Sequence, residues 1–256
     1  MIQITGLQKA FHGTEVLRGV DLEIREGETA VIIGRSGGGK SVLLKHLCGL
    51  LKPDRGQVVV DGVDIVPLRE GELPPIRKKF GFLFQGAALF DSLTLFDNVA
   101  VPLREERRAE AEIERRVMEM LELVDLAKAR DKKPAELSGG MRKRAGLARA
   151  CVARPKYMLY DEPTTGLDPI RADNINELIL RMRDHLQVTG VAVTHDMTSA
   201  YKIADRMAML HEGRIYAVGT PAEIQRSADP IVQQFIHGIS DAKLKEDSDH
   251  GGVSIH

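Results

Sequence analysis

The sequence predicts an α/β fold, in which a mainly parallel sheet is covered by helices on both faces. Short segments rich in Val and Ile alternate with segments that are apolar at helical spacing, which is the pattern of strand–helix–strand units. The charge-dense run 104–126 interrupts this alternation and carries a single apolar stripe, which is typical of an amphipathic helix. We therefore expect an α/β core with a helical insertion.

Composition limits the class of protein. Hydrophobic residues make up 43% of the 256 residues and charged residues 29%, as in ordinary soluble globular domains. Lys and Arg total 36 against 37 Asp and Glu, and this balance argues against a general nucleic-acid binder but leaves room for a local basic patch. Cys48 and Cys151 form no disulfide framework, so a reducing cytoplasm is expected. Neither a signal peptide nor a run of eighteen apolar residues is visible.

The first third of the chain predicts strands around one helix. The segments 2–4, 16–24 and 29–34 alternate as short strands do, and 41–51 is apolar at helical spacing. PDRGQVVVDG (53–62) is expected to be a turn, a strand and a second turn, and FGFLF (80–84) a further strand.

The remainder predicts the helical insertion and the rest of the sheet. We expect a helical subdomain at about 86–155, in which one helix face carries Ile113, Val117, Met120, Leu121 and Val124. The later expected elements are a strand at 157–161, a helix at about 170–187, a strand at 191–195, a hairpin at 207–219 and a short helix at 221–225. The predicted domain spans 1–240, and the polar segment 241–256 is expected to be disordered.

The loop GRSGGGKS (34–41) carries the first chemical signal. It fits the pattern G-x-x-x-x-G-K-[ST] and lies between a predicted strand and a predicted helix. Such a loop turns backbone N–H groups toward phosphate oxygens, beside the positive end of the helix. We expect Lys40 to reach the β- and γ-phosphates and the Ser41 hydroxyl to bind Mg²⁺. The candidate nucleotide-binding residues here are Gly34, Arg35, Ser36, Gly37, Gly38, Gly39, Lys40, Ser41 and Val42.

The segment YMLYDE (157–162) is an apolar strand that ends in two carboxylates. Asp161 at the strand end is placed to bind Mg²⁺ through water. Glu162 is one residue further on and suits a general base that activates water. An Asp-Glu pair before Pro163 is also a good turn, and it is the preceding phosphate loop that favours the catalytic interpretation.

The short stretch LSGGM (137–141) heads a basic, helix-forming run. Alone, Ser138 reads equally well as a helix N-cap, and Gly139 with Gly140 as an ordinary turn. Together, a phosphate loop, a later L-S-G-G and a following apolar strand ending in DE resemble the ATP-binding cassette (ABC) ATPases. The resemblance covers about 2–225. It implies a P-loop NTPase fold with an N-terminal antiparallel β portion, and a homodimer in which the serine and glycines contact ATP held by the other subunit.

The resemblance assigns roles to four further residues. Gln85 matches the family's Q-loop glutamine, which contacts Mg²⁺ and water, and Asp168 in TTGLD (164–168) matches the D-loop at the dimer seam. His195 matches the switch histidine that contacts the γ-phosphate, and Phe11 the aromatic that stacks on adenine. The structural alternatives are a polar strand end for Gln85, a cap or core residue for His195 and a core side chain for Phe11. Implied catalytic residues are thus Glu162, His195, Gln85 and Lys40, and implied Mg²⁺ ligands Ser41, Gln85 and Asp161.

Two departures from the family pattern lead to a subgroup. Met141 stands where the family has glutamine after LSGG, and Val42 where it has threonine after GKS. With LSGGMRKRAGLARA (137–150), they resemble the ATPase subunit of Mla-type phospholipid transporters. This resemblance implies a peripheral protein at the cytoplasmic face of the bacterial inner membrane. The implied partners are permease subunits, a periplasmic Mce-domain protein and a small STAS-domain protein, and no nucleic acid.

Other functions remain as alternatives to this interpretation. The serious one keeps ATP hydrolysis and changes the cargo, to an amino acid or another polar solute. A DNA-repair or chromosome-maintenance ATPase would carry long coiled coils between phosphate loop and signature, and no sustained heptads are visible there. Within 86–103, the apolar residues Phe90, Leu93, Leu95 and Phe96 suggest a groove for a permease helix, or else subdomain core.

Overall fold

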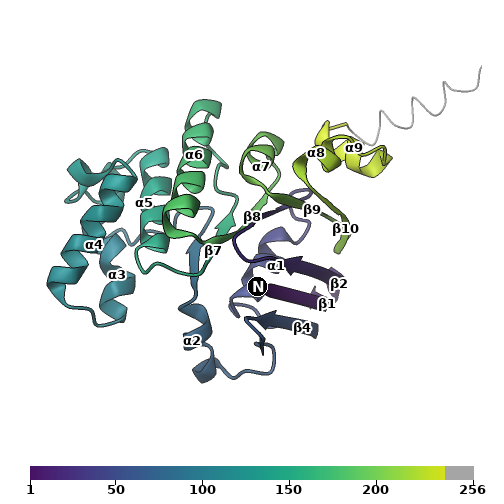
Figure 1. The fold of residues 1–256 in the computed structure, drawn as a ribbon, viewed down its shortest axis with the longest axis horizontal. Helices are drawn as coiled ribbons and strands as arrows, with labels where there is room; N and C mark the ends of the chain where they lie inside the picture. Colours follow the sequence, from purple (N-terminus) through teal and green to yellow (C-terminus); the bar gives the residue numbers. More distant parts are fainter. Residues whose placement is uncertain (240–256) are drawn as a thin grey trace, which may run out of the picture.

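The computed structural model describes residues 1–239, so the expected disorder of 241–256 lies outside the described residues. Within this range the chain forms two sheets and a set of helices (Figure 1). The strands are β1 (Ile2–Phe11), β2 (Thr14–Ile24), β3 (Thr29–Ile33), β4 (Arg55–Val60), β5 (Val63–Asp64), β6 (Phe80–Leu83), β7 (Tyr157–Asp161), β8 (Thr189–Thr194), β9 (Arg206–His211) and β10 (Arg214–Gly219).

The larger sheet has the strand order β10-β9-β3-β8-β7-β6 within the described residues. All neighbours in it are parallel except β9 and β10, which form the expected hairpin. Parallel strands place their carboxyl ends at one edge of a sheet, and ligands of open α/β sheets bind there. The segments that follow β3, β7 and β8 therefore meet at one edge, because these three strands are neighbours.

The smaller sheet is antiparallel, with the order β2-β1-β4-β5 among the described strands. It confirms the antiparallel N-terminal portion. The first strand is longer than expected, however, since β1 continues from Ile2 to Phe11 and not only to residue 4. Its register with β2 shifts after Ile4 and again after Leu7, and Gly6 has a positive φ of 58°. These bulges break the alternation of side chains, so the period-2 pattern ends before the strand does.

The helices are α1 (Lys40–Leu47), α2 (Pro74–Arg77), α3 (Leu95–Glu105), α4 (Glu110–Leu123), α5 (Gly139–Cys151), α6 (Pro169–Leu186), α7 (Met197–Ile203), α8 (Pro221–Gln225) and α9 (Pro230–Ile236). Short 3₁₀ turns occupy Glu70–Glu72, Ala127–Ala129 and Pro134–Glu136. The helix expected at 41–51 is shorter, because Cys48 leaves helical geometry and Gly49 takes a positive φ of 68°.

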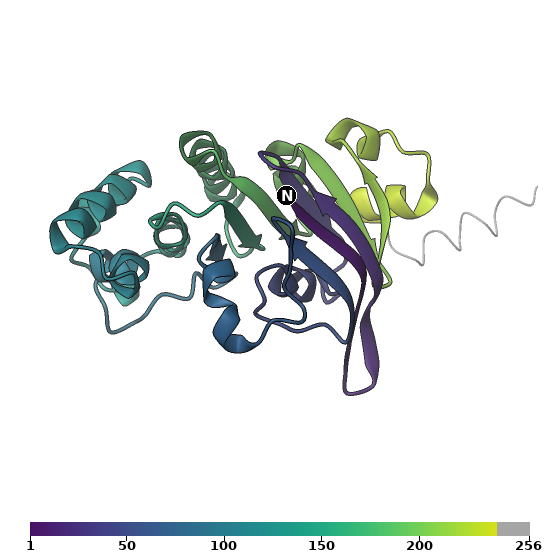
Figure 2. The ribbon, with the colours of Figure 1, turned by 60° about the horizontal axis from the view of Figure 1, so that its bottom comes forward.

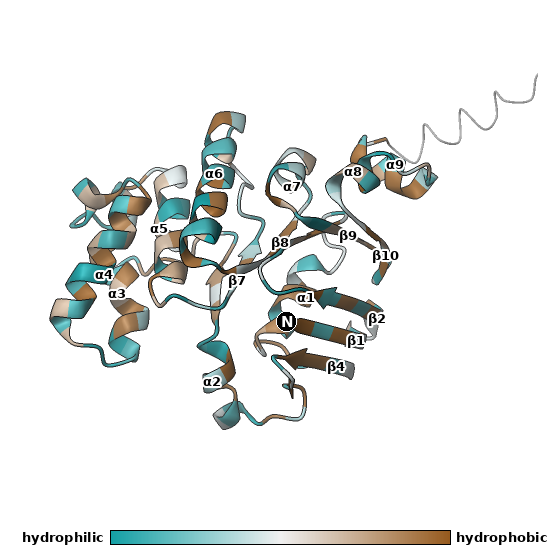
Figure 3. Cartoon of the chain, in the orientation of Figure 1, coloured by the Kyte–Doolittle hydropathy of each residue, from teal (hydrophilic) through white to brown (hydrophobic). Residues whose placement is uncertain are grey.

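The two faces of the larger sheet bury separate cores. In β3, Ile32 packs with α1 and the antiparallel sheet, whereas Val31 and Ile33 pack with the helices of the other face. Side chains alternate across a strand, so one run of apolar residues supplies both cores. Apolar residues accordingly run through the strands in Figure 3.

Helices α3, α4 and α5 gather at one end of the molecule (Figures 1 and 2). The Thr94 side chain caps α3 by accepting from the Asp97 N–H, and Pro102 lies inside this helix. The stripe predicted for α4 is buried as expected: Ile113, Val117, Met120, Leu121 and Val124. The boundaries 86–155 of a distinct subdomain stay a prediction.

Asp61 joins the two sheets. It lies in the turn after β4, and its carboxylate accepts hydrogen bonds from Lys79 Nζ at 2.8 Å, Lys156 Nζ at 2.9 Å and the Tyr157 hydroxyl at 2.6 Å. These donors flank or belong to β6 and β7 of the larger sheet. Partial burial opposes ionisation of Asp61, but the three donors more than offset it and hold the pKa of this carboxyl well below its usual range.

Candidate functional site

The glycine-rich loop runs from the end of β3 to the start of α1, as its sequence requires. A Cβ atom on Gly34 would lie 2.4 Å from the Leu210 carbonyl oxygen, so only glycine fits beside β9. Gly39 has a positive φ of 95°, and a Cβ there would lie 2.9 Å from Val16 Cγ1. Arg35, Ser36 and Gly37 are exposed, whereas Lys40 is buried. The loop is thus closely packed at both ends and open to solvent at its middle.

The Lys40 ammonium lies at the centre of the site. It donates to the carbonyl oxygens of Gly34 at 2.8 Å and Arg35 at 3.1 Å, and it pairs with Glu162 Oε1 at 3.4 Å. Only 4% of Lys40 is exposed, so its charge is held within the fold by these three partners. A phosphate entering the loop would meet a cation that is already in place.

Ser41 and Asp161 face each other across the sheet edge. The Ser41 hydroxyl at the start of α1 donates to Asp161 Oδ1 at the end of β7, at 2.6 Å. A serine hydroxyl and a carboxylate are hard oxygen donors, the kind that Mg²⁺ prefers beside a phosphate. The pair therefore fits Mg²⁺, although no group of three His, Cys, Asp or Glu side chains suited to a metal occurs among residues 1–239.

Glu162 lies between Lys40 and His195. Its Oε2 accepts from His195 Nδ1 at 2.9 Å, Thr165 Oγ1 at 3.1 Å and Thr194 Oγ1 at 3.3 Å. Burial disfavours the ionised carboxylate, but the hydrogen bond from His195 and the charge of Lys40 outweigh it and lower the pKa of Glu162. The side chain is therefore ionised at neutral pH and can accept a proton.

The backbone of Glu162 has an unusual conformation. Its φ is +47°, a left-handed value that costs a non-glycine residue about 1–3 kcal/mol and persists only where the surroundings enforce it. Three hydrogen bonds hold it here: the Glu162 N–H donates to Val193 O at 2.9 Å, and the Glu162 carbonyl accepts from Lys143 Nζ at 3.2 Å and from the Thr165 N–H at 3.3 Å. This turn sends the Glu162 side chain toward Lys40 and His195.

The signature residues lie elsewhere on the surface of the same chain. Ser138 is exposed and caps α5 by accepting from the Met141 N–H at 3.3 Å, so its N-cap geometry is real. A Cβ on Gly139 would lie 4.0 Å from Leu167 Cδ2, and one on Gly140 3.8 Å from Arg171 Cδ. Leu167 and Arg171 belong to the segment where α6 begins, and Asp168, the exposed N-cap of α6, lies between them. The signature and Asp168 thus share one surface.

The three other sequence candidates differ in their surroundings. Gln85 is exposed in the turn after β6, and its backbone carbonyl accepts from Lys143 Nζ. Phe11 is 38% exposed at the end of β1, where Lys9 Nζ lies 5.4 Å from its ring centroid. Val42 is half-buried against the core between the sheets. Phe11 is therefore not a core residue, which was its structural alternative.

Comparison with known proteins decides the family. The family model described as "ABC transporter" matches residues 17–165. The chain belongs to the ABC transporter ATP-binding family. It is accordingly an ATP-binding subunit of an ABC transporter, an ATPase whose hydrolysis is coupled to transport. ATPases of this family bind ATP, generally with Mg²⁺, and work as dimers paired with membrane permease subunits.

Relatives of this ABC ATPase carry several transport names. A "probable ribonucleotide transport ATP-binding protein mkl" of Mycobacterium leprae is 44% identical over 99% of this chain and 74% of its own length. The "methionine import ATP-binding protein MetN" of Carboxydothermus hydrogenoformans is 41% identical over 96% and 74%. The "intermembrane phospholipid transport system ATP-binding protein MlaF" of Haemophilus influenzae is 40% identical over 88% and 86%.

Solved structures of ABC cassettes have the same fold. An ATP-binding cassette determined as a dimer in a post-hydrolysis state, bound to ADP and Pi, is 33% identical with a TM-score of 0.80 over 86% of this chain and 99% of that one. CbiO1 of Clostridium perfringens, part of the ABC transporter complex cbiONQ, is 29% identical with a TM-score of 0.81 over 97% and 98%. The predicted P-loop NTPase fold of ABC type is confirmed.

Two groups in this ABC ATPase site escaped sequence reasoning. Thr194 donates to Glu162, and its own oxygen accepts from the Asp196 N–H at 3.0 Å, so it holds the end of β8. Lys143 is buried on α5 and contacts two site segments that lie 58 and 19 residues away. Its only sequence signal is a lysine on the apolar side of the helix that follows the signature.

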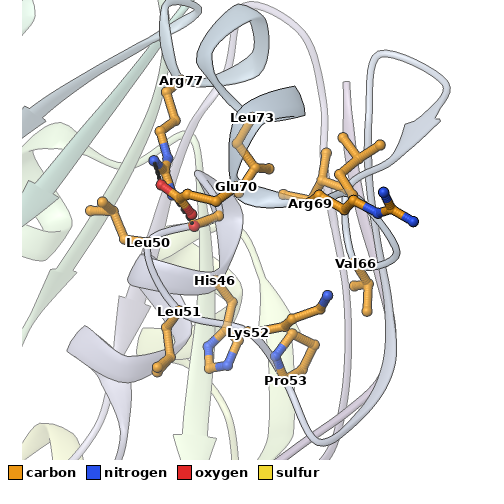
Figure 4. Close-up of a pocket in the computed structure, with 13 residues that line it drawn as sticks. His46, Leu50, Leu51, Lys52, Pro53, Val66, Arg69, Glu70, Leu73 and Arg77 are labelled. Carbon is orange, nitrogen blue, oxygen red and sulfur yellow. Dashed lines mark hydrogen bonds and ion pairs between the residues drawn. The ribbon is translucent and has the colours of Figure 1, made fainter.

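A separate pocket of about 350 Å³ lies away from the nucleotide site (Figure 4). It is enclosed by the end of α1, the segment after β5 and the start of α2, and it contains none of the predicted site residues. Arg77 crosses it, donating to Glu70 and to the Gly49 carbonyl at 2.9 Å. These contacts fasten α2 to the end of the phosphate-loop helix.

Proposed function

We propose that Lys40, Ser41, Asp161, Glu162 and His195 form the ATP hydrolysis site of this ABC ATPase. The observation that carries the proposal is the position of the Glu162 carboxylate, 3.4 Å from Lys40 Nζ and 2.9 Å from His195 Nδ1. An ionised carboxylate held between a phosphate-binding lysine and a histidine is suited to orient water and take its proton. The phosphate loop beside these residues would bind the ATP itself.

Substrate binding rests on the loop. The amides of 35–41 and the Lys40 ammonium bind the β- and γ-phosphates of ATP, and the start of α1 adds its positive end. Ser41 and Asp161 would hold Mg²⁺, with Gln85 as a further ligand, and Mg²⁺ when bound would neutralise charge that develops on the phosphates. Phe11 supplies a ring for adenine, a contact with little base specificity.

Hydrolysis then depends on groups of this chain. Glu162 accepts the proton of the attacking water, while Lys40 balances charge on the phosphoryl oxygens. His195 donates from Nδ1 to Glu162, which leaves its Nε2 on the other side of the ring, available to the γ-phosphate or the water. Thr165 and Thr194 keep the carboxylate in one orientation.

The signature residues act on a second copy of the chain. Ser138, Gly139 and Gly140 present a hydroxyl and unpaired amides at the N-terminus of a thirteen-residue helix, which favours an anion. In a head-to-tail homodimer these groups contact ATP that is bound to the partner's phosphate loop, and Asp168 lies at the seam. Each active site is then complete only in the dimer.

The test of this site is Glu162→Gln. The variant is expected to bind ATP as the wild type does and to lose turnover by roughly 100-fold or more, because a neutral amide cannot accept the proton. The closed, ATP-bound dimer should accumulate and be visible by size-exclusion chromatography. Turnover within a few-fold of the wild type would remove Glu162 from the role of base.

For the cargo, we propose phospholipid, moved between the inner and outer membranes of a bacterium. Similarity to MlaF over 86% of that protein's length supports this. Met141 and Val42, where this chain departs from the family pattern, are the residues on which the resemblance to Mla-type ATPases rests. The alternative is a polar solute such as an amino acid, which the similarity to MetN favours. The partners of the phospholipid system would be a permease, an Mce-domain protein and a STAS-domain protein.

The placement of this subunit follows from the proposed partners. Within residues 1–239 no helix combines the length and apolar character that a bilayer crossing requires. We propose that the chain binds peripherally to its permease at the cytoplasmic face of the inner membrane. A groove of about 750 Å³ between β6 and α5, lined by Phe82, Phe84 and Phe90, is proposed as the permease contact.

The sequence suggests that Phe90, Leu93, Leu95 and Phe96 line a groove for a permease helix, and of these four the lining of this groove includes Phe90. Phe90 is 51% exposed and lines the groove. Leu95, in contrast, is fully buried in the core, and Phe96 packs against that core with Arg130 over its ring at 4.6 Å. Leu95 therefore follows the alternative that the sequence left open, subdomain core, because the start of α3 turns this side chain inward.

Purification of the tagged chain from gently solubilised native membranes tests the cargo. Mass spectrometry of the copurified proteins and lipids is expected to find a permease, an Mce-domain protein and bound phospholipid. A permease for polar solutes without an Mce-domain partner would overturn the phospholipid proposal and leave the ATPase site untouched.

A further inference from the structure

Helix α5, which starts at the signature, is also fastened to the turn that carries Gln85. On one side of α5, Lys143 and Arg149 make hydrogen bonds to this turn, and Gly146 packs closely against it. Lys143 donates to the Gln85 carbonyl, and Arg149 donates to the carbonyls of Ala87 at 2.9 Å and Ala88 at 2.7 Å. Between them lies Gly146, where a Cβ would be 2.9 Å from Leu83 Cδ1, so no larger residue fits there without displacing β6 or the turn.

Lys143 differs from the other two, because it also reaches the catalytic strand. Its ammonium donates to the Glu162 carbonyl at 3.2 Å, and only 6% of the residue is exposed. A lysine ammonium carries three N–H donors on a flexible stem, so one buried charge can hold two carbonyls from different elements. One side chain thus joins α5, the Gln85 turn and the end of β7.

The Glu162 carbonyl is a significant place for such a contact. Glu162 has a φ of +47°, a left-handed value that a non-glycine residue keeps only where its surroundings enforce it. The N–H of this residue donates to Val193 O, and its carbonyl accepts from Lys143 Nζ at 3.2 Å and from the Thr165 N–H at 3.3 Å. Without Lys143, the Glu162 carbonyl would keep only the longer bond from the Thr165 N–H, so the peptide after Glu162 would be held less firmly and the carboxylate would be directed less precisely at Lys40 and His195.

We propose that Lys143 is a positioning residue for ATP hydrolysis, which holds the backbone of Glu162 in its left-handed conformation and ties it to the Gln85 turn. The proposal rests on the proposed role of Glu162 as the base. It predicts an effect on the chemical step and not on nucleotide binding, since Lys143 contacts backbone carbonyls behind the carboxylate. Lys40 and the loop amides, which bind phosphate, keep their own partners.

The experiment compares Lys143→Met with Arg116→Met in the full chain. Methionine keeps the apolar stem and removes the ammonium in both variants. Arg116 is the matched control, since it is also a buried basic residue, 8% exposed, whose guanidinium donates to a backbone carbonyl, that of Val152 at 2.6 Å, and it contacts no site residue. Each variant is measured for kcat, KM for ATP and Tm.

We expect Lys143→Met to lower kcat about 10- to 100-fold with KM for ATP within threefold, because misplacing a catalytic group by about 1 Å has such an effect. Arg116→Met should lower Tm with little change in kcat. Lys143→Gln, which keeps a neutral donor, should recover part of kcat and serves if the methionine variant does not fold. Equal kcat in Lys143→Met and Arg116→Met at comparable Tm would overturn the proposal.

A double variant separates this proposal from the assignment of the base. If Lys143 acts through Glu162, adding Lys143→Met to Glu162→Gln should leave the residual single-turnover rate unchanged. A further tenfold fall would mean that Lys143 acts by another route and would overturn its positioning role. Should Glu162→Gln alone keep wild-type turnover, the assignment of the base fails, whatever Lys143 does.

Discussion

Asp61 is a single residue on which the joint between the two sheets depends. Replacing it by Asn removes the charge that Lys79, Lys156 and Tyr157 share. We expect Asp61→Asn to lower the free energy of unfolding by about 1.5–3 kcal/mol at pH 7, the range for hydrogen bonds to a charged group. Thermal or urea unfolding of both proteins would measure the difference.

The pH dependence of that difference follows from the sign of the pKa shift. The pKa of Asp61 is lower in the folded chain than in the unfolded one, so the folded state binds fewer protons. Its contribution is therefore fully present above about pH 4, the usual range of an Asp carboxyl, and is lost as the pH falls through the folded pKa. The gap between wild type and Asp61→Asn should shrink below pH 4. The control is Asp131→Asn at an exposed carboxyl, which should leave the free energy of unfolding close to that of the wild type at every pH. A difference between wild type and Asp61→Asn that did not change with pH would contradict the assigned cause.

At the scale of elements, α5 carries the signature and offers a test of the dimer. Ser138→Arg should leave ATP binding by the isolated chain intact and reduce turnover roughly 100-fold or more. The long arginine side chain would fill the space that the γ-phosphate of the partner's ATP must occupy, so the signature could not contact it in the closed dimer. ATP binding by fluorescence titration and phosphate release would measure the two effects. Strongly weakened ATP binding by the monomer would show that Ser138 acts within its own chain.

The N-cap role of Ser138 needs its own control. Ser138→Asp keeps a capping oxygen for the Met141 N–H, so the helix and its Tm should be preserved. Its negative charge would repel the partner's phosphate, and turnover should still be lost. Full turnover in Ser138→Asp would mean that the serine matters only as a cap.

The groove between β6 and α5 gives a second test at this scale. Phe90→Asp places a charge on a half-exposed ring position, so the free energy of unfolding should change by no more than about 0.5 kcal/mol. We expect basal ATPase activity to remain and stimulation by the permease to be lost in reconstituted vesicles. Val63→Asp, which is 42% exposed on β5 outside the groove, is the matched control and should keep the stimulation. Normal stimulation in Phe90→Asp would exclude the groove as the contact.

For the whole molecule, local signals predict well and long-range contacts do not. The end of β7 is readable because five buried residues lead directly into Asp161 and Glu162, and the phosphate loop is readable because strand, glycines and helix are consecutive. The length of β1 is not, since bulges interrupt its alternation, and Pro102 hides the continuity of α3. The contacts of Lys143 join residues that no spacing rule relates. The geometry brings Lys40, Ser41, Asp161, Glu162 and His195 together, and their roles stay predictions until tested.

The place of β3 inside the larger sheet has a consequence for amide hydrogen exchange. This strand is paired on both sides, by β8 and β9, and all five of its residues are buried, so its amides should exchange only when the whole domain unfolds. ATP should then slow exchange selectively in 34–40 at low denaturant, while β3 is already slow without nucleotide. If the amides of β3 instead exchanged fast without nucleotide and slowly with it, the strand beneath the phosphate loop would become stably ordered only when nucleotide binds.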